Sequence, residues 1–322
     1  MYRSLHNTVK QRITNPKLRI SPRVATALAD GAPVVALEST VISHGMPWPQ
    51  NLRVAQELED TVRAGGAEPA TIACLQGNIV VGCEPEQLEL LASTGTAARK
   101  VSTRDFPWVL SDPAAVGATT VAGTCVAAAA AGIQVFATGG LGGVHRGGEL
   151  SMDVSADLIE LSRQPVAVVC AGVKSLLDIP RTLEVLETFG VPVTTLQHDK
   201  FPCFFVPDSG VASPHTSAST AAVAAAIHAQ ASAQLAGGML VAVPPPDHPA
   251  AQQAADAIRT AVRECEEAGI QGKDITPWIL ARTAELTGGA SVEANIELIK
   301  HNAKVATEIA VELSSRNRET RG

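Results

Sequence analysis

The sequence predicts an α/β fold, a three-layer α/β/α arrangement around a mixed, largely parallel central sheet. Short runs of Val, Ile, Leu and Ala alternate with stretches of helical periodicity along the chain. This alternation is typical of strands joined by crossover helices. Hydrophobic residues make up 46% of the 322 residues but aromatic residues only 3%, so the core must consist of small aliphatic side chains. Such a core suits a sheet covered by alanine-rich helices.

Strands are expected where a short apolar run meets glycine or polar residues. The segment "TIACLQGNIVVG" contains a Gln-Gly-Asn turn signal and is expected to form two strands. The predicted strand segments are the start of 33–40, then 71–82, 133–140, 166–171, 191–196 and 237–246.

Helices are expected where apolar residues recur every three or four positions. In 51–64, Leu52, Leu58 and Val62 fall on one face, and two glycines follow. The remaining predicted helices are 84–94, 117–131, 153–163, 180–189, an alanine-rich segment after 220, about 249–268 and about 291–314.

The chain is long enough for one large domain, which we expect at 21–316, with a short tail at 317–322. Residues 1–20 are expected to form a basic extension, because the first 29 residues contain six Lys or Arg and no acid. Such an extension is compatible with an organellar targeting peptide or with disorder in a cytoplasmic protein. The Pro/Ser/Thr-rich stretch 207–220 is expected to be a surface connection.

Composition disfavours several classes of function. A net charge of −7 argues against nucleic acid as the main partner, and no apolar run reaches membrane-spanning length. The six cysteines form no CxxC pair, and neither Cys nor His shows the spacing of zinc ligands. We therefore expect buried, reduced thiols.

Polar residues stand at the ends of three predicted strands: Glu38, Thr138 and Lys174. Ligands of α/β proteins collect at the carboxyl ends of strands, so a catalytic pocket is expected there. Lys174 closely follows an apolar run, and it either extends to water or is a desolvated amine. Desolvation disfavours a charged amine, and a neutral amine can form a Schiff base. Glu38 either caps backbone amides or transfers protons.

The segment 138–158, "TGGLGGVHRGGELSMDVSADL", is dense in glycine, which allows a backbone to approach a ligand closely. It matches neither the dinucleotide nor the phosphate-loop pattern. Asp153 and Asp157 are four residues apart and are expected on one helical face. They are either a cap and a solvent-facing charge or a site for a hard cation such as Mg²⁺ or Mn²⁺.

Longer segments resemble the pseudouridine-5′-phosphate glycosidase family, also called indigoidine-synthase-A-like. They include "VVALESTVISHGMPWPQN", "KVSTRDFP", "GATTVAGT", "VAVVCAGVKSLLDIPRTLEVLET" and "ITPWILARTAELTGGASVEANIELIKHNA". The resemblance runs from about residue 21 to 313. It implies reversible cleavage of the C–C glycosidic bond of pseudouridine 5′-phosphate to uracil and ribose 5-phosphate, within pseudouridine catabolism.

The resemblance also implies roles for individual residues. Lys174 would be the nucleophile, Glu38 the proton donor, and Asp153 would hold one Mn²⁺ per subunit, largely through water. The implied substrate contacts are Lys100, Val121, Thr138, His145, Ser155, Ala156, Asp157 and Asn295. The family further implies a homotrimer, and a separate pseudouridine kinase that would supply the substrate.

Two other interpretations remain open at the level of the sequence. A Schiff-base aldolase or lyase acting on another sugar phosphate would use Lys174 but need no uracil pocket. An inactive sugar-phosphate-binding protein would keep the pocket without the chemistry.

Overall fold

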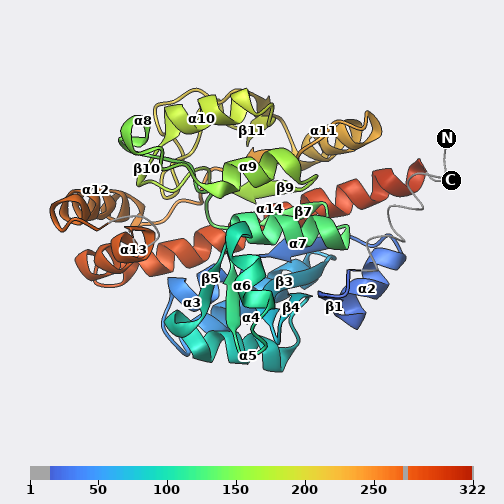
Figure 1. Ribbon diagram of the computed structural model, residues 1–322. Coiled ribbons are helices and arrows are strands. Elements are labelled where there is room, and N and C mark those ends of the chain that lie inside the picture. The colour runs from blue at the N-terminus through green and yellow to red at the C-terminus, as the bar shows by residue number, and fades with distance from the viewer. Residues whose placement is uncertain (1–14, 271–274, 321–322) are drawn as a thin grey trace.

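The computed structural model describes residues 15–270 and 275–320, which form a mixed, largely parallel sheet flanked by helices (Figure 1). The predicted fold class is confirmed. In this part of the chain, neighbouring strands of the main sheet follow the order β1-β4-β3-β2-β7-β9-β13-β11-β12, with β6 beside β3 and β5 beside β6. Pairing is parallel except where β3 meets β4 and β6.

The strands are short, as expected for crossover-connected α/β proteins. The main sheet consists of β1 (Leu18–Ile20), β2 (Val34–Leu37), β3 (Glu68–Leu75), β4 (Asn78–Val81), β5 (Arg99–Val101), β6 (Val116–Thr119), β7 (Val135–Ala137), β9 (Ala167–Cys170), β11 (Val193–Leu196), β12 (Thr216–Ser217) and β13 (Met239–Ala242). A separate antiparallel pair is formed by β8 (Val144–His145) and β10 (Leu177–Asp178).

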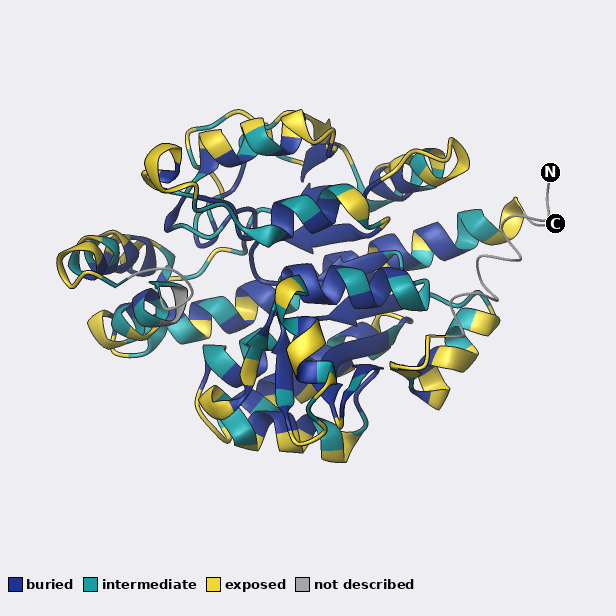
Figure 2. Cartoon of the chain, viewed as in Figure 1, coloured by how far each residue is buried: buried dark blue, intermediate teal, exposed yellow. Residues whose placement is uncertain are grey.

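The helices cover both faces of the sheet, and their solvent-facing sides carry most of the exposed residues (Figure 2). The α-helices are α2 (Pro22–Ala29), α3 (Thr40–Gly45), α4 (Gln50–Ala64), α5 (Pro85–Thr94), α6 (Phe106–Leu110), α7 (Val121–Ala131), α8 (Gly148–Ser151), α9 (Ala156–Arg163), α10 (Ile179–Thr188), α11 (Thr220–Ser232), α12 (Ala251–Glu267), α13 (Ile275–Leu286) and α14 (Ala290–Glu319).

The long helix α14 packs against the central strands β2, β7 and β9, and it also contacts α4 and α11. Helix α7 packs against β2, β3 and α9. A continuous core of mostly aliphatic side chains includes residues from Leu18 to Leu313, and the central strands are buried on both faces, as in sheets of this kind. In the described part of the chain, no helix combines the length and apolarity needed to cross a membrane.

Two predicted helices begin later than the sequence periodicity suggested. Residues 116–119 form β6 instead of the start of a helix, because Gly117 fits between Val101 and Cys74, where a Cβ would lie 2.7 and 3.0 Å from their side chains. The predicted helix 153–163 begins at residue 156, because the Ser155 hydroxyl accepts a hydrogen bond from Asp157 N and caps the helix.

Folded elements extend past residues 21–316 at both ends, and the predicted single domain stays a prediction. The sheet begins before residue 21, since Leu18 of β1 is buried and pairs in parallel with Ile79. At the other end, α14 continues to Glu319 and so includes part of the predicted tail. Most of the predicted basic extension, residues 1–14, lies outside the described residues, as do 321–322.

Candidate active site

The register of the central strands brings Glu38 and Thr138 together. In the parallel sheet, Leu37 of β2 lies opposite Ala137 of β7, so the next residue of each strand emerges at the same carboxyl edge. There the Thr138 hydroxyl donates a short hydrogen bond to Oε1 of Glu38. The expected meeting of these two side chains is therefore observed.

Lys174 reaches the same edge through a tightly held loop after β9. The amide of Leu141 donates to Gly172 O (2.9 Å), and the amide of Lys174 donates to Leu141 O (3.1 Å). Gly172 has a φ of +78°, and a Cβ there would lie 2.3 Å from Pro202 O, so only glycine fits. These contacts fix the backbone of Lys174 against the glycine-rich segment.

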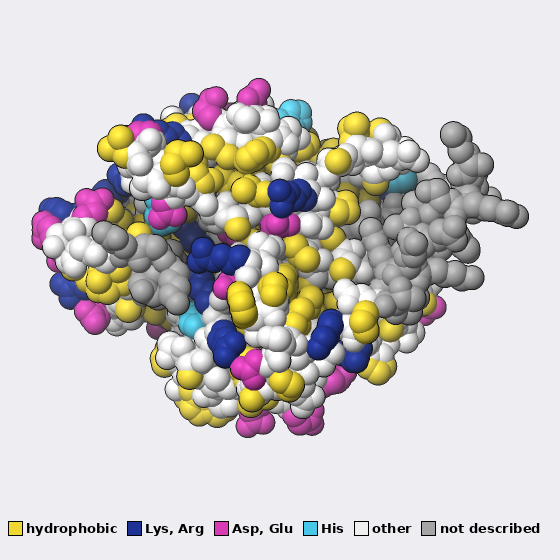
Figure 3. All heavy atoms as spheres, in the orientation of Figure 1, with side chains coloured by type: hydrophobic (Ala, Val, Ile, Leu, Met, Phe, Trp, Pro, Cys, Tyr) yellow, Lys and Arg dark blue, Asp and Glu magenta, His cyan; other side chains and the backbone are white. Residues whose placement is uncertain are grey.

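Glu38, Lys100 and Lys174 line one cavity at this edge of the sheet. The cavity encloses about 780 Å³, including its mouth open to solvent. Lys and Arg side chains also gather around a hollow on the face seen in Figure 3. The other cavity-lining residues are Thr40, Val41, His44, Gly45, Gly139, Gly140, Ser175, Leu176, Phe204, Ile258, Ile279, Leu280, Asn295 and Ile299.

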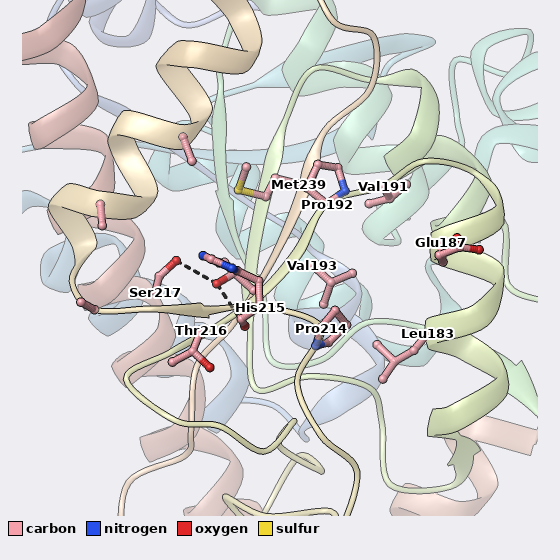
Figure 4. A pocket seen from close by; sticks show the side chains of 14 residues that line it. Leu183, Glu187, Val191, Pro192, Val193, Pro214, His215, Thr216, Ser217 and Met239 are labelled. Carbon is pink, nitrogen blue, oxygen red and sulfur yellow. Dashed lines mark hydrogen bonds between the residues drawn. The ribbon is translucent and has the colours of Figure 1, made fainter.

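A second cavity, of about 1120 Å³ with its open mouth included, lies beside β11 and β12 at the edge of the sheet. Its lining is mostly aliphatic, with Leu183 and Glu187 on α10 and Val193, Pro214 and His215 nearby (Figure 4). None of the residues that line it is a lysine or arginine. The smaller cavity, with two lysines beside a carboxyl group, is therefore the candidate active site.

The environment of Glu38 favours its protonated form. Burial has the largest effect and raises the pKa of the carboxyl group above its ordinary value of 4.5, despite the opposing charge of Lys174 and the hydrogen bond from Thr138. Desolvation penalises a carboxylate more than a neutral acid. Glu38 therefore keeps its proton to higher pH than an ordinary glutamate, as a proton donor requires.

Glu38→Gln is expected to stabilise the fold at neutral pH. Because the pKa of Glu38 is higher in the folded state, its contribution to stability is fully present below pH 4.5 and is lost as the pH rises through the raised value. Glutamine does not titrate, so the free energy of unfolding of the variant should increase relative to that of the wild type as the pH rises from 4.5 through the raised pKa of Glu38. Denaturant unfolding between about pH 4 and about pH 8 measures this, and a gap independent of pH would contradict the expectation.

The structure separates the two aspartates that the sequence placed on one helical face. Asp157 is buried, and its two oxygens accept hydrogen bonds from the amides of Ala122 (2.9 Å) and Gly142 (2.9 Å). Asp153 precedes the helix, and its side chain is 38% exposed. The predicted shared face is wrong, because Ser155 starts the helix between them. Asp157 instead ties the start of α7 to the glycine-rich segment.

The glycines of this segment serve protein packing at several positions. A Cβ on Gly142 would lie 2.4 Å from Ser155 Oγ, and one on Gly140 would lie 2.7 Å from the Phe204 ring.

Val121, at the start of α7, is 1% exposed, so only its backbone could face a ligand. Ala156 opens α9 directly after the capping serine.

Asp153 and His145 offer a small donor set for a cation. His145 Nε2 lies 3.9 Å from Asp153 Oδ2, and burial lowers the pKa of His145, which favours neutral imidazole. In residues 15–270 and 275–320, no group of three His, Cys, Asp or Glu side chains could hold a metal. A single carboxylate fits Mg²⁺ or Mn²⁺ only where the ion keeps most of its water ligands, and the water-mediated site at Asp153 stays a prediction.

Two polar atoms at the cavity have no partner among the described residues, Asn295 Oδ1 and His44 Nε2. Buried polar groups are normally hydrogen-bonded, so these atoms are suited to a ligand. Asn295 was predicted as a substrate contact, whereas His44 was missed. The signal for His44 was its place six residues after Glu38 in "ESTVISHGM", where the short helix α3 turns back to the cavity.

Comparison with known proteins identifies the family of the chain. The family model described as indigoidine synthase A like protein matches residues 23–312. The chain belongs to this family. It is 52% identical over 297 residues to the pseudouridine-5′-phosphate glycosidase of Deinococcus radiodurans, covering 92% of this chain and 94% of that protein. It is 49% identical over 298 residues to the protein of the same name from Alkaliphilus metalliredigens, covering 92% and 96%.

Two solved structures share the fold. The prealnumycin C-glycosynthase AlnA, in complex with ribulose 5-phosphate, superposes with a TM-score of 0.84 at 37% identity, covering 95% of this chain and 99% of AlnA. An indigoidine synthase A-like protein from Thermotoga maritima gives a TM-score of 0.81 at 33% identity, covering 92% and 96%.

Proposed function

We propose that this protein is a pseudouridine-5′-phosphate glycosidase, which reversibly cleaves the C–C glycosidic bond of its substrate to give uracil and ribose 5-phosphate. The observation that carries the proposal is the pairing, in one cavity, of Lys174 with a glutamic acid whose pKa is raised by burial. The names of relatives about 50% identical support it. The sugar phosphate bound to AlnA, a C-glycosynthase, supports a related chemistry.

The chemistry of a C–C glycoside explains why a lysine is needed. No linking oxygen can be protonated, so the paired-carboxylate route of ordinary glycosidases does not apply. The amine of Lys174 instead bonds to C1′ as the C1′–O4′ bond breaks and the ribose ring opens, and O4′ becomes a hydroxyl by taking a proton that the newly bonded nitrogen releases. When C5 of uracil receives a proton, the C1′–C5 bond breaks and the nitrogen lone pair forms an iminium at C1′. Water then hydrolyses the iminium and releases ribose 5-phosphate and Lys174.

Glu38 is the proposed source of the proton for C5 of uracil. Its carboxyl group is held by Thr138 at the same cavity as Lys174. In the reverse reaction the carboxylate takes the proton back. Asn295 and His44 line the cavity, and each has a buried polar atom without a partner among the described residues, so they are the proposed contacts for the amide edges of the base.

The remaining predicted residues would bind the anionic part of the substrate. Lys100 supplies positive charge at the cavity, and Val121 supplies its backbone at the start of α7. Ser155, Ala156 and Asp157 shape the neighbouring turn. Mn²⁺ held at Asp153, through water and beside His145, would supply further positive charge near the phosphate.

The proposal extends to assembly and substrate supply. We expect a homotrimer, measurable by light scattering of the purified protein. We also propose that a separate kinase supplies the substrate by phosphorylating pseudouridine, because the proposed reaction starts from the 5′-phosphate.

Uracil release from pseudouridine 5′-phosphate, with and without Mn²⁺, tests the proposed function. We expect release that increases with Mn²⁺ and decreases on chelation, and synthesis of pseudouridine 5′-phosphate from uracil and ribose 5-phosphate. A Schiff-base aldolase that acts on another sugar phosphate could form a Schiff base with ribose 5-phosphate, but it would make no pseudouridine 5′-phosphate. An inactive binding protein would bind the sugar phosphate and do neither.

A further inference from the structure

A buried amide of α14 holds the loop that follows β7. Asn302 is fully buried, and its Nδ2 donates hydrogen bonds to the carbonyl oxygens of Thr138 (2.8 Å) and Gly139 (3.3 Å). These are the first two residues after the strand, 164 and 163 positions away in sequence. A residue far along the chain therefore fixes the backbone from which the Thr138 hydroxyl reaches Glu38.

The contact belongs to one continuous face of α14. Asn295, Ile299 and Asn302 are spaced i, i+4 and i+7, so they share a face of the helix. A Cβ on Gly139 would lie 3.0 Å from Ile299 Cγ1 and 3.6 Å from Asn295 Oδ1. The loop after β7 therefore packs directly against this face, and α14 fixes the position of the loop relative to the sheet.

Packing alone does not favour an amide at residue 302. Asn302 Oδ1 is buried without a hydrogen-bond partner among the described residues, and leaving a buried acceptor unpaired is destabilising. The Nδ2 group is the part of the side chain with partners, and both partners lie in the loop beside Glu38. The amide is thus explained by the position of the loop.

We propose that Asn302 is a positioning residue for proton transfer: it fixes the Thr138–Gly139 backbone so that the Thr138 hydroxyl holds Glu38 toward the substrate. This inference rests on the proposed function for the role of Glu38 as proton donor. Asn302 acts through Thr138, and its removal should slow the step that uses Glu38 while leaving substrate binding largely intact.

Steady-state kinetics of Asn302→Leu test the inference, with Ser314→Ala as the matched control. Ser314 also donates from α14 to a distant backbone carbonyl, Gly31 O (2.6 Å), but outside the residues that line the cavity. We expect kcat of N302L to fall about 10- to 100-fold, the range for small displacements of catalytic groups, with KM changed less than about 3-fold. S314A should keep kcat within about 2-fold.

Coupling to Thr138→Val distinguishes positioning from general destabilisation. If Asn302 acts through Thr138, the double variant should be no slower than T138V beyond about 2-fold, because the shared interaction is already lost. If the loss of kcat in the double variant equalled the product of the losses in the two single variants, the inference would be overturned. Asn302→Ala gives a second variant of different volume in case N302L does not fold.

A measurement without turnover keeps the two proposals separate. The infrared carboxyl band that disappears in Glu38→Gln reports protonation of Glu38. Its midpoint should move to higher pH in N302L and T138V, because the Thr138 hydrogen bond favours the carboxylate, and should not move in S314A. The charged or titratable groups near Glu38 that stay unchanged in this comparison are Lys174, Asp157, Lys100 and His44.

If the midpoint is shifted in N302L relative to the wild type but the wild type releases no uracil, Asn302 is supported as the residue that positions Glu38 and the proposed function is rejected. Uracil release by the wild type, with N302L equal to S314A in both kcat and midpoint, would reject the role of Asn302 alone.

Discussion

Lys174→Ala is expected to lower kcat for uracil release by about 10³-fold or more, because the variant has no amine to form the covalent intermediate. The fold should survive, since Lys174 is only half-buried and its loop is held by backbone hydrogen bonds that alanine keeps. Stopped assays of uracil formation under saturating substrate measure the loss directly.

Two other lysines provide controls for this result. Lys304→Ala removes an exposed lysine of α14 and should leave kcat within about 2-fold. Lys100→Ala removes charge from the cavity and should raise KM more than it lowers kcat, as expected for a group that binds the substrate. Near-normal turnover by Lys174→Ala would contradict the proposed mechanism.

Glu38→Gln is expected to lower kcat by about 10²- to 10⁴-fold, the usual contribution of a general acid. Glutamine has nearly the same shape and still offers an oxygen to the Thr138 hydroxyl, but it cannot supply a proton. Formation of the Lys174 adduct with ribose 5-phosphate should persist, because that step requires the lysine. Loss of both activities would indicate damage to the site as a whole.

Glu59→Gln is the matched control for this variant. Glu59 is also a buried glutamate that accepts a hydrogen bond from a threonine, Thr71 Oγ1 (2.7 Å), and it pairs with Arg63 (2.7 Å). It is not among the residues that line the cavity. Its substitution should reduce stability but leave kcat close to wild type. An equal loss of activity in both variants would show that any buried glutamate matters in this fold.

The pH dependence of kcat should also differ between the wild type and Glu38→Gln. A proton donor must be protonated, so the rate should fall as the pH rises through the raised pKa of Glu38. This alkaline limb should be absent from the residual activity of Glu38→Gln. If kcat of Glu38→Gln fell at alkaline pH as it does in the wild type, the group that titrates would not be Glu38.

The fold class and the position of the site were predictable because their signals are local. Glu38, Thr138 and Lys174 each follow a short apolar run, and parallel strands must bring their carboxyl ends to one edge of the sheet. These carboxyl ends meet at one edge whichever strands are neighbours. The structure adds the register, with Leu37 opposite Ala137, and this register explains why Thr138 bonds to Glu38.

Features that depend on distant contacts were not predictable from local pattern. Residues 117–119 lie just before the alanine-rich segment 121–131 and were therefore included in its predicted helix, but Gly117 is required by the closeness of Val101 and Cys74 in the sheet. The spacing of Asp153 and Asp157 suggested a shared helical face, and only the cap at Ser155 rules it out. The sequence does not distinguish Asn302 from the other polar residues of its helix, and only the contact with Thr138 identifies it.

The most direct test of the central claim is borohydride reduction in the presence of ribose 5-phosphate, followed by peptide mass mapping. A Schiff base at Lys174 predicts one modified peptide, containing residue 174, in the wild type and in Glu38→Gln, and no modification there in Lys174→Ala. Modification of Lys100 in place of Lys174, or no adduct on a protein that releases uracil, would contradict the account.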